Sequence, residues 1–335
     1  MNRQMQGKLY GFLFLSVTML AIFMPALIKN DYTIHILIMV FFNILIASSL
    51  RLIMTMGLVP FSHAAFVAIG GYTSALTVMK LGLSSWIGLI FAPITAMVIA
   101  IAFGFILLRL RGAYFFMATA AFGEIVLLIF TRWTNPFGGA AGLISIPLPN
   151  PITIPGLLSI GFGSKTSFYY LTLCVTWVLM LIAYRLDKGR MGAIWTGIQQ
   201  AEPLAQSVGI NVMLYKIIAF AVGSSMGAVA GALQAHYYSH INPAGFGFFQ
   251  LVNYLIFVMI GGHKRFIGPM IGASLLTMLT EFLSSYEALA LYQVIVYGMV
   301  LILVVMFLPE GIVSLPNKVF SWYQGFKGQG RLVRT

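Results

Sequence analysis

Ionisable and hydroxyl side chains inside long apolar segments are the residues of this sequence that could carry chemistry. Glu124, in TAAFGEIVLL, is the one of seven carboxylates that falls near the middle of such a segment. An ionisable group at that depth is costly unless it faces a cavity or a partner, which makes Glu124 a candidate for solute binding or proton transfer. A structural role stays open, because burial can keep a carboxyl neutral or pair it with a neighbouring helix.

A second candidate group lies at the break around Pro60, in the run FSHAAF. Ser62 and His63 combine polar groups with small and aromatic neighbours, and with Thr119 and Glu124 they form our candidate pathway for a polar solute. The alternative for His63 is a packed, hydrogen-bonded histidine. No other His, Asp, Glu or Cys stands at metal-ligand spacing from it, so we expect no metal site.

Motifs of catalysis and nucleotide binding are missing from the sequence. It contains no G-x-x-x-x-G-K-[ST] loop, no nucleophile elbow and no zincin helix. Its single cysteine, Cys174, lies within an apolar run and offers neither a disulfide nor a metal cluster. Uphill transport would therefore draw on an ion gradient or on a separate ATPase.

Residues 189–210 form a polar island between membrane-length apolar runs. Their apolar residues recur at helical spacing, with Thr196, Gln199, Gln200, Glu202, Gln206 and Ser207 on the other side. Pro203 suits the first turn of a new helix, so we predict two short helices joined near residue 202. Such an element either docks on a soluble partner or lies on the lipid surface.

The composition indicates that the elements that position these residues lie in a membrane. Hydrophobic residues make up 60% of the chain, charged residues 8%, and the mean hydropathy is +0.96, which predicts an all-α polytopic membrane protein. We predict about ten transmembrane helices, each near the 20 residues that a bilayer requires. They cover residues 9–28, 32–54, 62–79, 85–108, 113–131, 166–184, 213–237, 246–262, 266–285 and 289–308.

The basic residues orient these spans. With the N- and C-termini cytoplasmic, fifteen of the 19 basic residues fall inside and only Lys29, Lys80, Arg132 and Lys165 outside. This places residues 187–212 and the basic tail 310–335 in the cytoplasm, and the Gly- and Pro-rich loop 132–165 outside. The membrane orientation thus explains the net charge of +12, which does not indicate nucleic-acid binding.

An even division at the outer loop gives two halves of five helices with opposite orientations. Inverted halves recur in transporters, with the pathway between them. The segments GLVPFSHAAFVAIGGYTSAL and GGHKRFIGPMIGASLLTML share small and aromatic residues that fit such a repeat. A stripe of small residues along 213–237 predicts close helix packing.

Six blocks give the chain a family resemblance over residues 30–313. They are GLVPFSHAAFVAIGGYTSAL, LRLRGAYFFMATAAFGEI, FGGAAGLISIP, the polar island through GINVMLYKIIAFAVGSSMGAVAGAL, IGGHKRFIGPMIGA and YGMVLILVVMFLPEGIV. In this order the blocks resemble the permease subunits of branched-chain amino acid ABC importers of the LivM type. The resemblance implies a transport subunit of the bacterial inner membrane rather than an enzyme.

The resemblance also implies partners and roles. Residues 190–209 would dock on a cytoplasmic ATP-binding subunit through Gly192, Trp195, Ile198, Gln199, Glu202, Ala205 and Gly209, with Trp195 as the apolar anchor. Further expected partners are a second related permease, a second ATPase, an extracytoplasmic solute-binding protein and membrane lipid. ATP and magnesium would be used by the ATPases, with no cofactor on this chain. Alternatives are a permease for urea or short-chain amides, a proton-coupled carrier using Glu124, and a structural membrane scaffold.

Overall fold

The computed structural model describes residues 21–27, 30–154, 158–285 and 311–314, together with residues 295, 298, 299, 302, 303 and 306. Its helices are α2 (Asp31–Met54), α3 (His63–Met79), α4 (Ser85–Leu107), α5 (Ala113–Arg132), α6 (Thr134–Phe137), α7 (Lys165–Lys188), α8 (Arg190–Gln200), α9 (Glu202–Ser207), α10 (Val212–Tyr238), α11 (Phe248–Gly261) and α12 (Gly268–Ser284). Predicted spans 9–28 and 289–308 and the tail 310–335 lie largely outside the described residues.

Long apolar helices dominate the described part of the chain, as expected for an all-α polytopic membrane protein. Among the described residues, six segments are long and apolar enough to cross a bilayer: α2, α4, α5, α7, α10 and Pro243–Gly261. Helices α3 and α12 are shorter, at 17 residues each. Helix α7 continues four residues beyond the predicted 184, and its last turn holds Arg185 and Lys188, which interact favourably with the carboxyl end of a helix.

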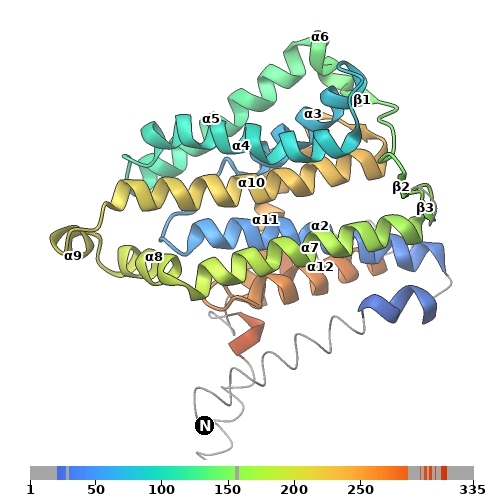
Figure 1. Ribbon diagram of the computed structural model, residues 1–335. Helices are drawn as coiled ribbons and strands as arrows, with labels where there is room; N and C mark the ends of the chain where they lie inside the picture. Colours follow the sequence, from blue (N-terminus) through green and yellow to red (C-terminus); the bar gives the residue numbers. More distant parts are fainter. Residues whose placement is uncertain are drawn as a thin grey trace, which may run out of the picture.

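An antiparallel pair, α2 and α10, runs through the middle of the molecule (Figure 1). At one end the His35 ring Nδ1 lies 2.6 Å from the Tyr237 hydroxyl. Fourteen residues further along α2 and fourteen back along α10, Gly223 lies directly against the Ser49 backbone and the Ile53 side chain. The absence of a side chain at Gly223 lets the two helices approach closely.

Helices α3 and α4 pack on α10 and lie above it in Figure 1. Helix α3 runs parallel to α10, because Val67 meets Gly231 near the middle and Ser74 Oγ meets His236 Nε2 at 2.8 Å further along. A methyl group at Gly231 would strike the Val67 carbonyl, and one at Gly70 would strike the Ala228 backbone. The predicted small-residue stripe is therefore confirmed as a packing face.

Helices α11 and α12 pack on α2, as α3 and α4 pack on α10. Helix α11 ends beside the end of α2, where Arg51 Nε donates to the His263 carbonyl at 3.0 Å, and α12 runs antiparallel to α2, with Asn43 Nδ2 donating to Thr277 Oγ1 at 2.9 Å. The division into two inverted halves of five helices stays a prediction.

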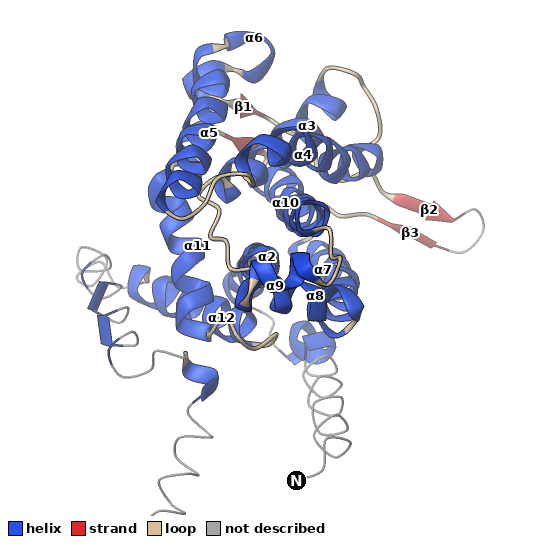
Figure 2. Cartoon of the chain, turned by 90° about the vertical axis from the view of Figure 1, so that its left-hand side faces the viewer, coloured by secondary structure: helices blue, strands red, loops and turns tan. Residues whose placement is uncertain are grey.

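The outer loop 132–165 contains regular structure that its Gly- and Pro-rich sequence did not predict. Besides α6 it holds the 3₁₀ turn Gly139–Ala141 and the strands β1 (Leu143–Ile144), β2 (Ile152–Ile154) and β3 (Leu158–Ile160), of which β2 and β3 pair with each other (Figure 2). Strand β1 pairs antiparallel with β4 (His240–Ile241), which follows α10 directly. The pairing holds the first part of the loop against the end of α10.

Replacing Gly231 by Val tests the α3–α10 contact. We expect a loss of at least about 1–3 kcal/mol in the free energy of unfolding, because the new side chain would force apart two helices whose backbones touch. Thermal unfolding of the detergent-purified protein measures it. Gly163→Val is the control, since a Cβ there meets open space. Equal unfolding temperatures for the two variants would contradict the packing.

Candidate coupling site and solute pathway

The coupling loop, residues 187–212, folds as two short helices, as predicted. Helix α8 ends at Gln200, Ala201 leaves the helical region at φ −154° and ψ 84°, and α9 starts at Glu202 with Pro203 in its first turn. Gly209 then adopts φ +83°, a conformation that favours glycine, and the chain turns into α10. The pair projects from the left end of the helices in Figure 1.

The inner face of the coupling loop packs on its own chain. Ile198, Ala205 and Val212 form a small apolar cluster, and Trp195 is fully buried, its indole N–H donating to the Tyr215 carbonyl at 3.0 Å. Our expectation that Trp195 inserts into a partner's groove is therefore corrected. An indole has a large apolar surface and one donor, and both are satisfied internally here.

The outer face of α9 carries apolar side chains. Leu204 is 65% exposed, and Val208, the residue that follows α9, is 69% exposed. The backbone leaves the helical region at Ala201, so α9 is a separate helix, with Leu204 exposed while Ala205 packs with Ile198. Exposed aliphatic side chains on a projecting loop are available to a soluble partner or to the lipid surface, the two alternatives that the sequence leaves open.

Glu202 ties the coupling loop to α10. Its Oε2 accepts from Lys216 Nζ at 2.8 Å, and the Lys216 side chain is only 5% exposed. Arg111, in the turn between α4 and α5, lies 3.6 Å from Glu202 Oε1 and is largely exposed, so it contributes little. Glu202, predicted as a docking residue, has an internal partner that holds α9 in place.

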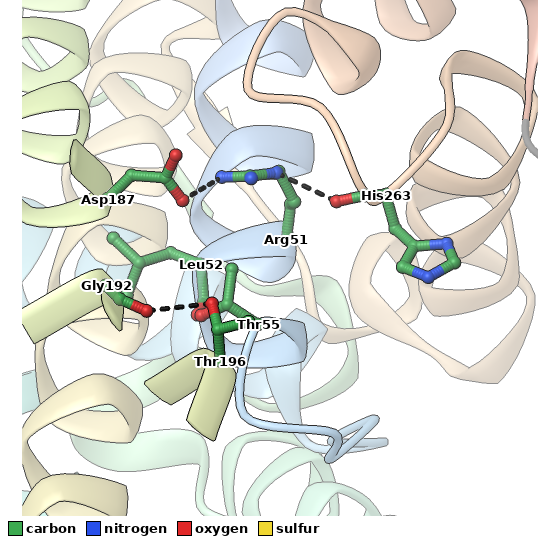
Figure 3. Close-up of polar contacts among 7 residues, drawn as sticks. All are labelled: Arg51, Leu52, Thr55, Asp187, Gly192, Thr196 and His263. Carbon is green, nitrogen blue, oxygen red and sulfur yellow. Dashed lines mark hydrogen bonds and ion pairs between the residues drawn. The ribbon is translucent and has the colours of Figure 1, made fainter. Parts of the chain in front are cut away.

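A second ion pair ties the start of the coupling loop to α2 (Figure 3). Arg51 Nη1 donates to Asp187 Oδ1 at 2.8 Å, and both side chains are largely buried. The same guanidinium donates through Nε to the His263 carbonyl and lies over the Phe266 ring. Arg51 therefore joins α2, the end of α7 and the turn between α11 and α12.

Close backbone packing reinforces this joint. A methyl group at Gly192 would strike the Asp187 carbonyl, so α8 can only fold against the end of α7 with glycine there. Thr196 Oγ1 donates to the Gly192 carbonyl at 2.8 Å, and Thr55 Oγ1 to the Leu52 carbonyl at 2.6 Å (Figure 3). Gln199 lies beside Gly57, just beyond α2.

The predicted pathway residues separate into buried and exposed positions. Ser62, His63 and Thr119 are fully buried: Thr119 Oγ1 accepts from the Phe61 N–H at 3.1 Å, and His63 Nε2 lies 2.9 Å from Ser49 Oγ. Glu124 is exposed and lines a cavity of 50 Å³ between the start of α3, α5 and the start of α11, which is large enough to admit water. A pathway role for these four residues stays a prediction.

Comparison with known proteins assigns the chain to a family. Residues 32–305 match the family described as branched-chain amino acid transport system / permease component. The chain belongs to this permease family. It is 28% identical over 321 residues to the high-affinity branched-chain amino acid transport system permease protein LivM of Escherichia coli K12, covering 90% of this chain and 74% of that protein.

Two further relatives extend the comparison. The permease is 28% identical over 272 residues to the LivH permease protein of Salmonella typhimurium, covering 78% and 87% of the two chains. It is 24% identical over 246 residues to the probable LivM permease protein of Methanocaldococcus jannaschii, covering 67% and 68%. No solved structure matches the permease.

Sequence reasoning missed the Arg51–Asp187 pair and the exposed side chains of α9. Arg51 and Asp187 are 136 residues apart, and only the packing of α7 on α2 brings them together. The available signal was an arginine at the end of one span and an aspartate at the end of another, both on the predicted cytoplasmic side. For Leu204 and Val208, the signal was the proline-marked helix break, which interrupts the helical period.

Removing one partner of the joint tests its burial. Asp187→Ala should lower the free energy of unfolding of the permease by about 3–5 kcal/mol, because the Arg51 charge stays buried without its counter-ion. The double variant Arg51→Met, Asp187→Leu should recover most of this loss. Arg111→Met, which removes an exposed pair, should cost less than about 1 kcal/mol. Thermal unfolding in detergent compares them, and equal effects of Asp187→Ala and Arg111→Met would contradict a buried joint.

Proposed function

We propose that this permease is one of two transmembrane subunits of an importer that passes branched-chain amino acids into the cell. Two cytoplasmic ATPases drive it, and an extracytoplasmic binding protein supplies the solute. The observation that carries the proposal is the coupling loop: it projects from the helices, exposes Leu204 and Val208, and is held to the central helices by two ion pairs.

The joints give the coupling loop a route to both halves of the permease. A force on α8 and α9 passes through Asp187 and Arg51 to α2 and to the turn after α11, and through Glu202 and Lys216 to the first turns of α10. Helices α2 and α10 are the antiparallel pair on which the other helices pack. Movement of an ATPase therefore acts on the central pair and not on a peripheral helix.

The substrate class is supported by the printed names of the relatives, which include LivM and LivH permease proteins of high-affinity branched-chain amino acid transport systems. LivM-like and LivH-like chains also support a partner permease related to this one. A cargo of urea or short-chain amides is the alternative, and a direct uptake assay separates it. The family membership leaves the proton-coupled carrier and the scaffold without a supporting observation.

The proposed orientation places the coupling loop in the cytoplasm of a ten-span protein of the inner membrane, with two inverted halves of five helices. It can be tested in a Cys174→Ser background with single cysteines at Gln206 in the coupling loop and Gly163 in the outer loop. In spheroplasts a membrane-impermeant maleimide should label Gly163→Cys and not Gln206→Cys, while disrupted membranes should label both. Labelling of Gln206→Cys in spheroplasts would overturn the orientation.

Charge on the outer face of α9 tests docking. The variant Leu204→Asp, Val208→Asp should reduce ATP-driven leucine uptake and co-purification of the ATPases by more than tenfold, because a carboxylate would be buried against the partner. Leu81→Asp is a matched control, since Leu81 is also 65% exposed but lies at the other end of the helices. Normal uptake by the double variant would sink the docking role of α9.

A further inference from the structure

A polar pocket of 420 Å³ lies at the end of the permease opposite the coupling loop. It is bounded by α2, by the last turns of α10, by the segment from β4 to the 3₁₀ turn Pro243–Phe246, and by α11. Pockets of about 300–1,000 Å³ are typical of small-molecule sites. The lining side chains that can form hydrogen bonds are Asn43, Gln234, Tyr238, His240, Asn242, Gln250 and Tyr254.

Several of these polar groups have hydrogen-bonding capacity that the described residues do not use. The Gln234 amide and the Tyr238 hydroxyl make no hydrogen bond to any described residue. Asn43 donates through Nδ2 to Thr277 Oγ1, which leaves its side-chain oxygen without a hydrogen bond to a described residue. Asn242 accepts from the Gly245 N–H through Oδ1, which leaves its Nδ2 without one. Free donors and acceptors from α2, α10 and the segment after β4 therefore converge on one space.

The charge and the apolar surface of the pocket lining limit the class of ligand that the pocket can bind. Among the described residues, the pocket lining contains no Asp, Glu, Lys or Arg, so a ligand with a net charge would lose hydration without gaining a counter-charge. Amides and a phenol can instead share hydrogen bonds with the carboxylate and the ammonium of a zwitterion. Met39, Phe42, Ile241 and Phe246 supply an apolar wall beside them. This combination suits a net-neutral amino acid with an aliphatic side chain.

We propose that this pocket is a solute-recognition site within the permease itself, which receives a zwitterionic aliphatic amino acid on its way through the subunit. The proposal rests on the proposed function and extends it, because selectivity then lies partly in the permease and not only in a binding protein. Helices α2 and α10 both line the pocket, and each carries one of the two ion pairs to the coupling loop. Movement of the coupling loop would thus alter the pocket through these helices.

The test uses the complete importer in detergent, without binding protein, and radiolabelled L-leucine as the probe. We expect weak, saturable binding that L-valine competes away and that L-lysine and L-glutamate do not. Gln234→Leu and Tyr238→Phe should each weaken binding by about tenfold, the effect of losing one hydrogen bond of roughly 1.4 kcal/mol. Tyr237→Phe is the matched control, because the Tyr237 hydroxyl meets His35 and does not line the pocket.

Uptake into proteoliposomes with saturating binding protein separates the two proposals. A lower leucine uptake rate in Gln234→Leu and Tyr238→Phe, with ATPase docking and the Tyr237→Phe rate unchanged, supports the pocket. Wild-type uptake together with unchanged binding and rates in both pocket variants overturns the pocket but leaves the proposed function intact. Absence of ATP-driven uptake of any branched-chain amino acid by the wild-type importer overturns the proposed function instead. Tyr238→Phe keeps the ring, so its loss of binding would not reflect a packing defect.

Discussion

The structure depends on the close antiparallel contact between α2 and α10. In a bilayer the hydrophobic effect does not drive helices together, so association relies on packing and on hydrogen bonds between helices. Glycines on α10 supply the packing: Gly223 admits α2 on one side, while Gly231 admits α3 on another. Because α3 and α4 pack on α10 while α11 and α12 pack on α2, the central contact also joins these two groups of helices.

Burying charged side chains in ion pairs is energetically unfavourable, because the charges lose their hydration. The positions of such pairs are therefore informative. The Arg51–Asp187 and Glu202–Lys216 pairs both sit where the coupling loop meets a central helix. Apolar residues of similar volume would often hold such a joint as well or better. Directional contacts to α2, to the His263 carbonyl and to α10 instead fix the loop in one arrangement, which is what transmission of movement requires.

Local properties could be predicted from the sequence, and contacts between distant segments could not. Hydropathy located eight described helices to within about four residues, and Pro203 located the break in the coupling loop. The burial of Trp195 and the exposure of Leu204 depend on how α8 and α9 pack on α10. The spacing of apolar residues along the sequence does not show this packing. Glu124 was a candidate because it lies near the middle of a predicted span. The position of a residue along a helix, however, does not determine whether its side chain faces the interior of the protein.

The pocket shows why a transport site can consist of neutral groups. A site that held a zwitterion with fixed charges would bind it tightly and would release it slowly, whereas passage requires affinity that is sufficient for entry and weak enough for departure. Hydrogen bonds from amides and a phenol are individually modest in water and are easily exchanged. The polar lining also comes from two helices and a connecting segment, so a small relative movement of α2 and α10 would separate the hydrogen-bonding groups and release the solute.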